Sequence, residues 1–273
     1  MKSFQNKNVL ITGGSSGIGF ALAEKLVAAG ANVWILARRD SLLDEAIAKL
    51  QLKATSQDQK IKKIKADVAN FSELKSTLGD VFSENLSPDL LINCAGIVHP
   101  GEFLAMKAED FAADISVDYL GTVYTIKIIA PFMVKNRSGH IVNISSLAGL
   151  VPIYGYSAYS PAKSAIGMFS SILKTELTPY NIAVSVVYPS DTDTPQLAYD
   201  NAHKPDITKE ITKGGGFQSP EFVADVILKG IQKKKFTIIP ALIARILKPF
   251  AAIVGKVFHI FALSEVKKEK KVL

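Results

Sequence analysis

Thr12-Gly13-Gly14-Ser15-Ser16-Gly17-Ile18-Gly19 joins an apolar run, residues 8–12, to an amphipathic segment of helical length, residues 17–29. Gly13, Gly17 and Gly19 allow a tight turn and let the backbone approach a pyrophosphate closely. The N-terminus of the following helix offers free N–H groups and a positive dipole to the same phosphates, and the hydroxyls of Ser15 and Ser16 add donors. The stretch therefore predicts a strand–turn–helix unit that binds the phosphates of a dinucleotide.

The rest of the chain repeats this alternation of strand and helix. Short apolar runs, often β-branched, are typical of strands that helices cover on both faces. They lie at residues 8–12, 32–37, 61–66, 90–93, 139–145, 183–188 and 236–239, with amphipathic segments between them, such as 41–50 and 158–177. The order predicts an α/β domain over residues 1–240, built as a doubly wound, seven-stranded parallel sheet of the Rossmann type with helices on both faces.

Residues 190–218 interrupt the alternation with a polar stretch rich in proline and glycine, which ends in Gly214-Gly215-Gly216. The stretch follows the carboxyl end of a strand, where open α/β sheets bind ligands. We interpret it as a substrate lid with a glycine hinge. The alternative is an ordinary surface loop.

Tyr159 and Lys163 are four residues apart on an expected helix, so they share a face. A free tyrosine titrates near about pH 10, and a neighbouring ammonium favours the phenolate and lowers that pKa. The pair is then suited to general acid–base catalysis, and Lys163 can also hold the nicotinamide ribose. Ser146, at the end of the fifth expected strand, can hydrogen-bond a substrate carbonyl. With the glycine-rich turn, these residues predict hydride transfer to or from a nicotinamide cofactor.

The end of the second expected strand bears on the choice of cofactor. A carboxylate there would hold the ribose 2′-OH of NAD, but the strand ends in Leu36-Ala37 and is followed by Arg38 and Arg39. A small residue leaves space, and a guanidinium can bind a 2′-phosphate with paired hydrogen bonds. We therefore expect NADPH to be preferred and Asp40, the nearest acid, to face solvent.

Two more segments follow expected strands at the same edge of the sheet. Asp67 and Val68 come after the third strand, where an acid and a small apolar residue can bracket an adenine. The segment Asn93-Cys94-Ala95-Gly96 follows the fourth strand and can place small residues against the cofactor. Cys94 is the one cysteine, which excludes an internal disulfide framework, and we interpret it as a buried small hydrophobe.

The chain of 273 residues carries a net charge of +7, concentrated toward its C-terminus. The four histidines show no metal-ligand spacing, so no metal site is expected. A basic end can meet nucleic acid or an anionic membrane. Because the same stretch is strongly apolar and resembles no nucleic-acid module, we favour the membrane. The few residues before the first strand predict no N-terminal signal peptide or membrane span.

Residues 241–273 form an expected C-terminal arm that is both apolar and basic. Arg245, Lys248, Lys256 and His259 interrupt the apolar stretch 236–263, whose longest uncharged run is nine residues, short of the roughly 20 that span a bilayer. At about 100° per residue these cations fall on one helix face, within roughly 80°. The pattern is typical of a helix in a membrane interface with its cations toward the headgroups, and Pro249 predicts two short helices. The alternative is an arm that packs on its own domain or on a twin subunit.

Together these motifs resemble the short-chain dehydrogenase/reductase family from residue 8 to about residue 239. The matching residues are Thr12-Gly13-x-x-x-Gly17-Ile18-Gly19, Asn93-Cys94-Ala95-Gly96 with one change, and Ser146, Tyr159 and Lys163, which match the family's catalytic residues. The resemblance implies further contacts to the nicotinamide end from Pro189, Thr192 and Thr194, although Ser190 replaces the glycine of the family's Pro-Gly turn.

Asp118 departs from the family pattern, which has an asparagine before the segment that matches Tyr119-Leu120-Gly121-Thr122. The resemblance implies that this position marks a helix kink and supports a water-mediated proton relay to Lys163. Aspartate has the same shape as asparagine but no side-chain donor. A role of the backbone can therefore survive, whereas a role of the side chain would be altered.

A narrower resemblance, over about thirty residues, is to the 3-ketodihydrosphingosine reductases. It is carried by Val187-Tyr188-Pro189-Ser190-Asp191-Thr192-Asp193-Thr194-Pro195, by Tyr159-Ser160-Pro161-x-Lys163, by Glu176-Leu177-x-Pro179-Tyr180-Asn181, and by Asn201 and Lys204-Pro205. This resemblance implies NADPH-dependent reduction of 3-ketosphinganine to sphinganine, with Tyr159 as proton donor to a long-chain keto lipid. Two alternatives are a reductase of another lipid-like ketone, such as a 3-oxoacyl thioester or a steroid, and a non-catalytic NADPH-binding membrane protein.

These resemblances also imply a place in the cell. We expect a membrane-associated protein that faces the cytoplasm, at the endoplasmic reticulum if the source is a eukaryote, and a homo-oligomer. The last residues, Lys270-Lys271-Val272-Leu273, fit a dilysine retrieval signal, with a charged solvated tail as the alternative.

Overall fold

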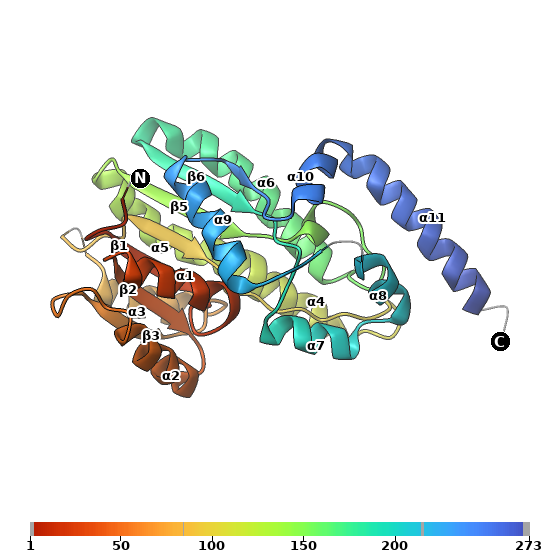
Figure 1. Ribbon diagram of the computed structural model, residues 1–273, viewed down its shortest axis with the longest axis horizontal. Helices are drawn as coiled ribbons and strands as arrows, with labels where there is room; N and C mark the ends of the chain where they lie inside the picture. The colour runs from red at the N-terminus through yellow and green to blue at the C-terminus, as the bar shows by residue number, and fades with distance from the viewer. Residues whose placement is uncertain (1–2, 84, 214–215, 270–273) are drawn as a thin grey trace.

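A seven-stranded parallel sheet forms the centre of the computed structural model, which describes residues 3–83, 85–213 and 216–269 (Figure 1). The strands lie in the order β3-β2-β1-β4-β5-β6-β9. Their bounds are β1 Asn8–Thr12, β2 Asn32–Ala37, β3 Ile61–Lys65, β4 Leu90–Asn93, β5 Gly139–Ile144, β6 Ile182–Val187 and β9 Thr237–Ile238. Because the order reverses between β1 and β4, the carboxyl ends of these strands flank the ligand crevice of a doubly wound sheet. The predicted Rossmann architecture is confirmed.

Helices cover both faces of the sheet, because successive side chains of each buried strand point to opposite faces. Val9 and Ile11 of β1 pack in the core under α1, α2 and α9, while Leu10 packs in the core under α3, α5 and α6. The helices of the domain are α1 Gly17–Ala28, α2 Asp40–Gln51, α3 Phe71–Val81, α4 Ala108–Asp114, α5 Gly121–Lys135, α6 Tyr159–Leu177 and α9 Pro220–Gln232.

Most strand bounds differ from the predicted ones by no more than one residue. β3 ends at Lys65 and β9 spans only Thr237–Ile238, whereas the apolar runs extend to Ala66 and over residues 236–239. Ala66 and Ile239 are buried without being part of the strands. The apolar runs predict which residues are buried, whereas the ends of a strand are set by where its backbone hydrogen bonds to the neighbouring strand stop.

The expected lid, residues 190–218, folds into short elements beside the sheet. It contains β7 Asp191–Thr192, α7 Pro195–His203, α8 Asp206–Thr212 and β8 Phe217–Gln218, and β7 pairs with β8 in parallel. The Thr194 hydroxyl accepts a hydrogen bond from the Leu197 N–H and so caps α7. Gly214 and Gly215 of the expected hinge lie outside the described residues.

The arm forms α10 Leu242–Leu247 and α11 Ala251–Glu269, joined by a short 3₁₀ turn that contains Pro249. The break at the proline is confirmed, but α11, with 19 residues, is not a short helix. One side of α11 packs on the lid, where Ala262 and Phe258 contact Ile207 and Ile211 of α8. The arm therefore packs on its own domain along one face.

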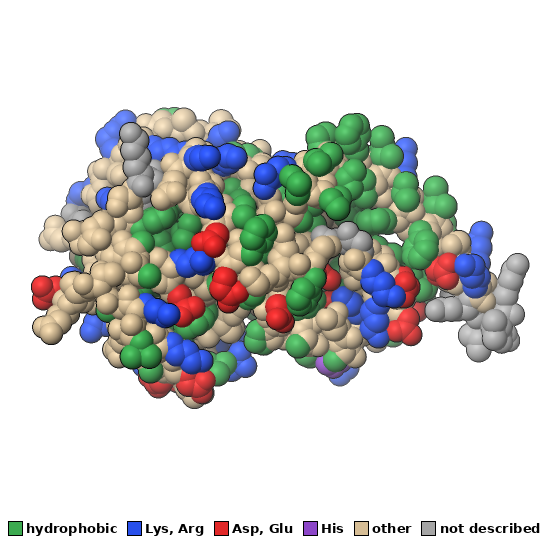
Figure 2. All heavy atoms as spheres, in the orientation of Figure 1, with side chains coloured by type: hydrophobic (Ala, Val, Ile, Leu, Met, Phe, Trp, Pro, Cys, Tyr) green, Lys and Arg blue, Asp and Glu red, His purple; other side chains and the backbone are tan. Residues whose placement is uncertain are grey.

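The other face of the arm carries exposed apolar side chains. They are Leu242, Ile243, Ile246, Leu247, Phe250, Ile253, Val257, Ile260, Phe261 and Leu263. Figure 2 shows hydrophobic side chains gathered over α10 and the adjoining part of α11. By length and composition, two helical stretches of the described residues could cross a membrane. Of the most apolar 18 residues in each stretch, 44% are buried for Ala108–Lys135, which belongs to the sheet domain, and only 11% for Leu242–Lys268.

Two of the four cations expected on the outer face of the arm lie against the domain instead. The Arg245 guanidinium donates to the carbonyl of Ile239 at 2.8 Å, and the Lys248 ammonium donates to the Thr237 hydroxyl at 3.0 Å. Lys256 and His259 are exposed. The single-face expectation is wrong for Arg245 and Lys248, because the turn at Pro249 separates their helical register from that of α11.

Candidate active site

The glycine-rich turn is closed against the end of β4. The Thr12 hydroxyl accepts hydrogen bonds from the N–H groups of Cys94 and Ala95, both at 3.1 Å. Gly13 has φ +68°, and a Cβ there would lie 2.8 Å from the Ala95 backbone. A Cβ at Gly19 would lie 2.3 Å from the Gly13 carbonyl oxygen. These two positions therefore require glycine, as a close phosphate approach does.

The N-terminus of α1 is available to an anion. Ser16 caps the helix with extended backbone, and its side chain makes no capping hydrogen bond within the described residues. The Ser16 side chain therefore leaves the N-terminus of α1 open to a phosphate, and the Gly19 N–H of this first turn points to the Cys94 sulfur. The surrounding residues Gly13, Ser16, Gly17, Ile18 and Gly19 line a cavity beside this turn, whereas Ser15 lies half-exposed outside its lining.

The segment after β4 divides between the cavity and the core. The Asn93 amide donates to the Asn143 side chain at 2.9 Å, and the Asn143 amide donates to Ser170, so Asn93 joins β4, β5 and α6 inside the fold. Cys94 and Gly96 line the cavity, and Ala95 packs against the core. Burial raises the pKa of the Cys94 thiol to about 12, which fits its interpretation as an unreactive small side chain.

The expected adenosine-binding residues lie at the ends of β2 and β3. Arg38 and Arg39 are exposed, and Arg38 Nη1 is 3.9 Å from Asp67 Oδ2. Asp40 is exposed and accepts a hydrogen bond from Lys63, as expected of a carboxylate that faces solvent.

Val68 and Asp67 follow β3, where a contact with adenine is expected. Val68 packs in the core, and a Cβ at Gly121 would lie 2.7 Å from it. Asp67 remains at the surface, with its carboxylate accepting from the Ala69 N–H at 2.9 Å.

Tyr159, Lys163 and Ser146 converge at the carboxyl end of β5, and all three line the cavity. The Ser146 side chain acts to lower the pKa of Tyr159, and the Lys163 ammonium lies 5.5 Å from the centroid of the Tyr159 ring. The Ser145 hydroxyl donates to the Lys163 carbonyl at 2.7 Å and fixes α6 on the strand. The Ser146 hydroxyl also accepts from the Ala148 N–H at 3.1 Å, which orients it at the start of the following turn.

The Lys163 charge acts to lower the pKa of Tyr159, as expected, but burial outweighs it. Burial raises the pKa of Tyr159 to about 12; the Lys163 charge acts in the opposite direction, and the Asp118 charge adds to the increase. The spacing of the two residues correctly predicted that Lys163 lies near Tyr159. It predicted neither the burial of Tyr159 nor the nearby charge of Asp118. At neutral pH the phenol is therefore protonated, which suits a proton donor.

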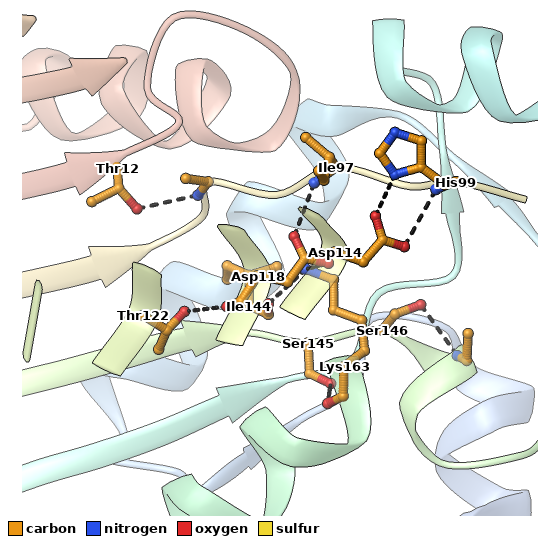
Figure 3. A network of polar contacts seen from close by, with 12 residues as sticks. Thr12, Ile97, His99, Asp114, Asp118, Thr122, Ile144, Ser145, Ser146 and Lys163 are labelled. Atoms are coloured by element: carbon orange, nitrogen blue, oxygen red, sulfur yellow. Dashed lines mark hydrogen bonds and ion pairs between the residues drawn. The ribbon is translucent and has the colours of Figure 1, made fainter. Parts of the chain in front are cut away.

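Asp118 lies beside Lys163 in a buried polar network (Figure 3). A π-helix, Ile115–Leu120, carries it between α4 and α5, in agreement with the expected irregularity of the helix. Asp118 Oδ2 is 3.4 Å from the Lys163 ammonium, and Asp118 Oδ1 accepts from the Ile97 N–H at 2.9 Å. The Asp118 carbonyl accepts from the Thr122 hydroxyl at 2.8 Å.

The charges of this pair act on each other. Burial raises the pKa of Asp118 to about 6 against the opposing charge of Lys163. Burial lowers the pKa of Lys163, but the charges of Asp118 and Tyr159 outweigh it and leave that pKa above its ordinary value.

A second acid, not anticipated from the sequence, lies one helical turn before Asp118. Asp114 is fully buried at the end of α4, and its Oδ1 is 2.6 Å from Nδ1 of His99. Burial raises the pKa of Asp114, and His99 opposes that increase. No sequence spacing links His99 to Asp114; they meet because the segment after β4 runs along α4 (Figure 3).

One cavity of about 460 Å³ runs from the glycine-rich turn past the three converging residues to the arm. Pro189, Thr192 and Thr194, expected at the nicotinamide end, line it together. Its far part is apolar and is formed by the loop before α6, the lid and the arm. The residues are Leu150, Val151 and Ile153 of the loop, Leu197 and Ile211 of the lid, and Ile243, Leu247, Val254 and Phe258 of the arm. Tyr156, Asp191 and Asp200 also line it, and no role was expected for these three.

Comparison with known proteins places the chain in a family. Residues 7–205 match the family model described as short chain dehydrogenase. A 3-dehydrosphinganine reductase from Danio rerio is 38% identical over 84% of this chain and 70% of that protein. A 3-ketodihydrosphingosine reductase from Dictyostelium discoideum is 36% identical over 90% of this chain and 78% of that protein.

A solved structure agrees with this assignment. A short-chain dehydrogenase from Sphingobium yanoikuyae in complex with NADPH has a TM-score of 0.77 and 27% identity, covering 92% of this chain and 95% of that one. On its sequence, its sheet topology and the residues of its cavity, the chain belongs to the short-chain dehydrogenase family.

Proposed function

We propose that this oxidoreductase reduces 3-ketosphinganine to sphinganine with NADPH. The observation that carries the proposal is the single cavity that joins the phosphate-binding turn, Tyr159 and an apolar wall contributed by the arm. A long-chain keto lipid needs such a wall beside the reacting carbonyl, because burial of its acyl chain supplies the binding free energy. The names of the relatives from Danio rerio and Dictyostelium discoideum point to the same substrate.

The residues of the cavity fit a nicotinamide cofactor. Gly13 and Gly19 leave no room for a Cβ beside the uncapped N-terminus of α1, as phosphate contact demands. Thr192, Thr194 and Lys163 would hold the nicotinamide and its ribose. When bound, the cofactor supplies the hydride that the 3-keto carbon receives.

The remaining chemistry belongs to the residues of the chain. Tyr159 donates its phenolic proton to the carbonyl oxygen, which becomes the hydroxyl of the product. Ser146 holds that oxygen by a hydrogen bond. Lys163 stabilises the phenolate left on Tyr159, and Asp118 holds Lys163 in its charged form until Tyr159 is protonated again.

The preference for NADPH over NADH rests on Arg38 and Arg39. Both are exposed beside the adenosine end of the crevice, and the acid that follows them is paired with Lys63. A 2′-phosphate would satisfy the guanidinium groups, whereas NAD would find no carboxylate at the end of β2. The preference would be contradicted by a lower dissociation constant for NADH than for NADPH in a fluorescence titration.

The arm is proposed to lie in a membrane interface, where the keto lipid resides. Its outer face carries Ile253 and Ile260, which are 60% and 67% exposed, with the exposed cations Lys256 and Lys267 beside them. An apolar stripe flanked by cations suits an anionic membrane surface. We place the protein on the cytoplasmic face of the endoplasmic reticulum if the source is a eukaryote, and as a homo-oligomer.

Flotation with anionic vesicles tests the arm. Ile253→Ser with Ile260→Ser removes exposed apolar surface without disturbing the packed face of α11, so flotation should fall while the melting temperature holds. Leu52→Ser, at a leucine outside the arm that is 84% exposed, is the control and should not change flotation. Unchanged flotation of the arm variant, together with its loss of oligomeric state in light scattering, would assign that face to a second copy of the chain instead.

Transfer of label tests the reaction itself. With NADPH that carries deuterium at both positions of C4 of the nicotinamide, mass spectrometry of the product should find sphinganine with one deuterium at C3. Sphinganine without deuterium, or no sphinganine from a protein that binds NADPH, would reject the proposed reaction.

A further inference from the structure

A buried cluster of charged and polar side chains lies in the lid beside the cavity. The Tyr156 hydroxyl donates to Asp200 Oδ2 at 2.7 Å, and the Lys204 ammonium lies 3.0 Å from the same oxygen. Asp191 Oδ2 is 3.9 Å from the Lys204 ammonium. Tyr156, Asp200 and Lys204 are each 5% exposed. Burial of two opposite charges is costly unless each is well paired. A charge of this cluster that has no partner within the protein would therefore point to a ligand.

The cluster has more negative charge than its own cation can balance. Two carboxylates, Asp191 and Asp200, face one ammonium, that of Lys204. Asp200 Oδ1 is buried and has no hydrogen-bond partner among the described residues. Burial raises the pKa of Asp191, with Lys204 opposing and the Asp200 charge adding to the increase. A buried carboxylate oxygen without a donor is a site at which a cation is stabilised.

The cluster is next to the reacting centre. Asp191 and Asp200 line the same cavity as Tyr159, and the rings of Tyr156 and Tyr159 pack edge to face with centroids 5.6 Å apart. The negative charge of Asp200 also contributes to the raised pKa of Tyr159, so its field reaches the proton donor. A cation held here would lie close to the carbonyl that Tyr159 protonates.

We propose that Asp200, assisted by Asp191, binds the ammonium group of the substrate and so selects 2-amino ketones over simple ketones. The inference rests on the proposed function, whose substrate carries an amine on the carbon bonded to the carbonyl carbon. In this substrate the amine nitrogen is two bonds from the carbonyl carbon and three bonds from the carbonyl oxygen, so a bound ammonium group lies next to the reacting atoms. The apolar wall can bind any long chain, whereas an unpaired buried carboxylate discriminates by charge.

Steady-state kinetics with two ketones tests the subsite. The substrates are 3-ketosphinganine and the 1-hydroxy-3-ketone of the same chain length that has hydrogen in place of the amine, both in the same detergent. The wild type should prefer the amino ketone in kcat/KM by on the order of 100-fold, the usual effect of a charged hydrogen bond in a buried site. Asp200→Asn should remove most of this preference by lowering kcat/KM for the amino ketone, with a change below about threefold for the amine-free ketone.

The control is Asp206→Asn, the same change at an exposed carboxylate of the same lid, which should leave both ketones unaffected. Asp191→Asn should reduce the preference in the same direction, and binding of NADPH together with the melting temperature checks that each variant is folded. If Asp200→Asn does not fold, the preference of the wild type for the amino ketone and its decrease in Asp191→Asn still test the ammonium subsite.

The possible outcomes distinguish failure of the ammonium subsite from failure of the proposed reaction. Equal kcat/KM for the two ketones in the wild type would contradict the proposed ammonium subsite. An equal decrease in kcat/KM for both ketones on Asp200→Asn would also contradict it, and the cluster would then only stabilise the folded lid. Reduction of neither ketone by a wild type that binds NADPH would overturn the proposed function and the subsite with it.

Discussion

Replacement of Asp118 by asparagine tests the electrostatics of the site most sharply. Burial raises the pKa of Asp118 from 3.8 to about 6 although Lys163 lies 3.4 Å away. Since each pKa unit is worth about 1.36 kcal/mol, the ionised carboxylate costs the folded protein about 3 kcal/mol. Asparagine keeps the shape of the side chain, and its oxygen can still accept from the Ile97 N–H.

The sign of the effect follows from proton binding. The folded protein binds the Asp118 proton more tightly than the unfolded chain does, so the cost is absent below the unfolded pKa and complete above about 6. Asp118→Asn has no proton to lose at this position. From about pH 4 to about pH 7, the free energy of unfolding of the variant should therefore rise by about 3 kcal/mol relative to the wild type.

Urea unfolding measures this difference directly. Trp34, the one tryptophan, is buried in β2 against Phe82, so its emission reports global unfolding. Asp225→Asn, at an exposed carboxylate, is the control and should follow the wild type at every pH. Curves of unfolding free energy against pH that are parallel for the wild type and Asp118→Asn would refute the raised pKa.

Four further changes have defined outcomes. Asp118→Asn should also move the alkaline limb of ketone reduction to lower pH, because the Asp118 charge raises the pKa of Tyr159; a pH–rate profile with an unmoved limb would count against this coupling. Tyr159→Phe should reduce turnover by about 10²–10⁴-fold with NADPH binding kept, as followed by stopped-flow absorbance and cofactor fluorescence. Arg38→Ala should weaken NADPH about tenfold or more and NADH little, and equal effects on both in calorimetry would remove Arg38 from the 2′-phosphate site. Gly19→Ala places a methyl group 2.3 Å from the Gly13 carbonyl, so cofactor binding and melting temperature should both fall, whereas Gly79→Ala, at a site with open space, should lower neither.

The sheet could be predicted because its strands are buried on both faces and read as short apolar runs. The order of the glycine-rich turn, Ser146, Tyr159 and Lys163 along the chain was enough to predict that they meet, since each follows a strand or lies on the helix beside one. Their placement around one cavity agrees with that prediction. The roles assigned to them remain predictions.

Features that depend on tertiary placement could not be predicted in this way. The raised pKa of Tyr159 needs the burial that only packing creates and the charge of Asp118 on another helix. The contact of Asp200 with Tyr156 needs the lid helix α7 to lie over the loop before α6. The prediction that all four cations of the arm share one helix face failed because it assumed one helical register across Pro249. Arg245 and Lys248 instead donate hydrogen bonds to Ile239 and Thr237 of the domain.

The central claim is that the cavity reduces a sphingoid ketone with NADPH. Its most direct test is the initial rate of NADPH oxidation by the full chain in detergent micelles, with 3-ketosphinganine beside a 3-oxoacyl thioester and a ketosteroid. The account predicts that kcat/KM is highest for 3-ketosphinganine and that sphinganine accumulates in proportion to the NADPH consumed. A higher kcat/KM for either of the other ketones would contradict it, and so would tight binding of NADPH without turnover of any of the three.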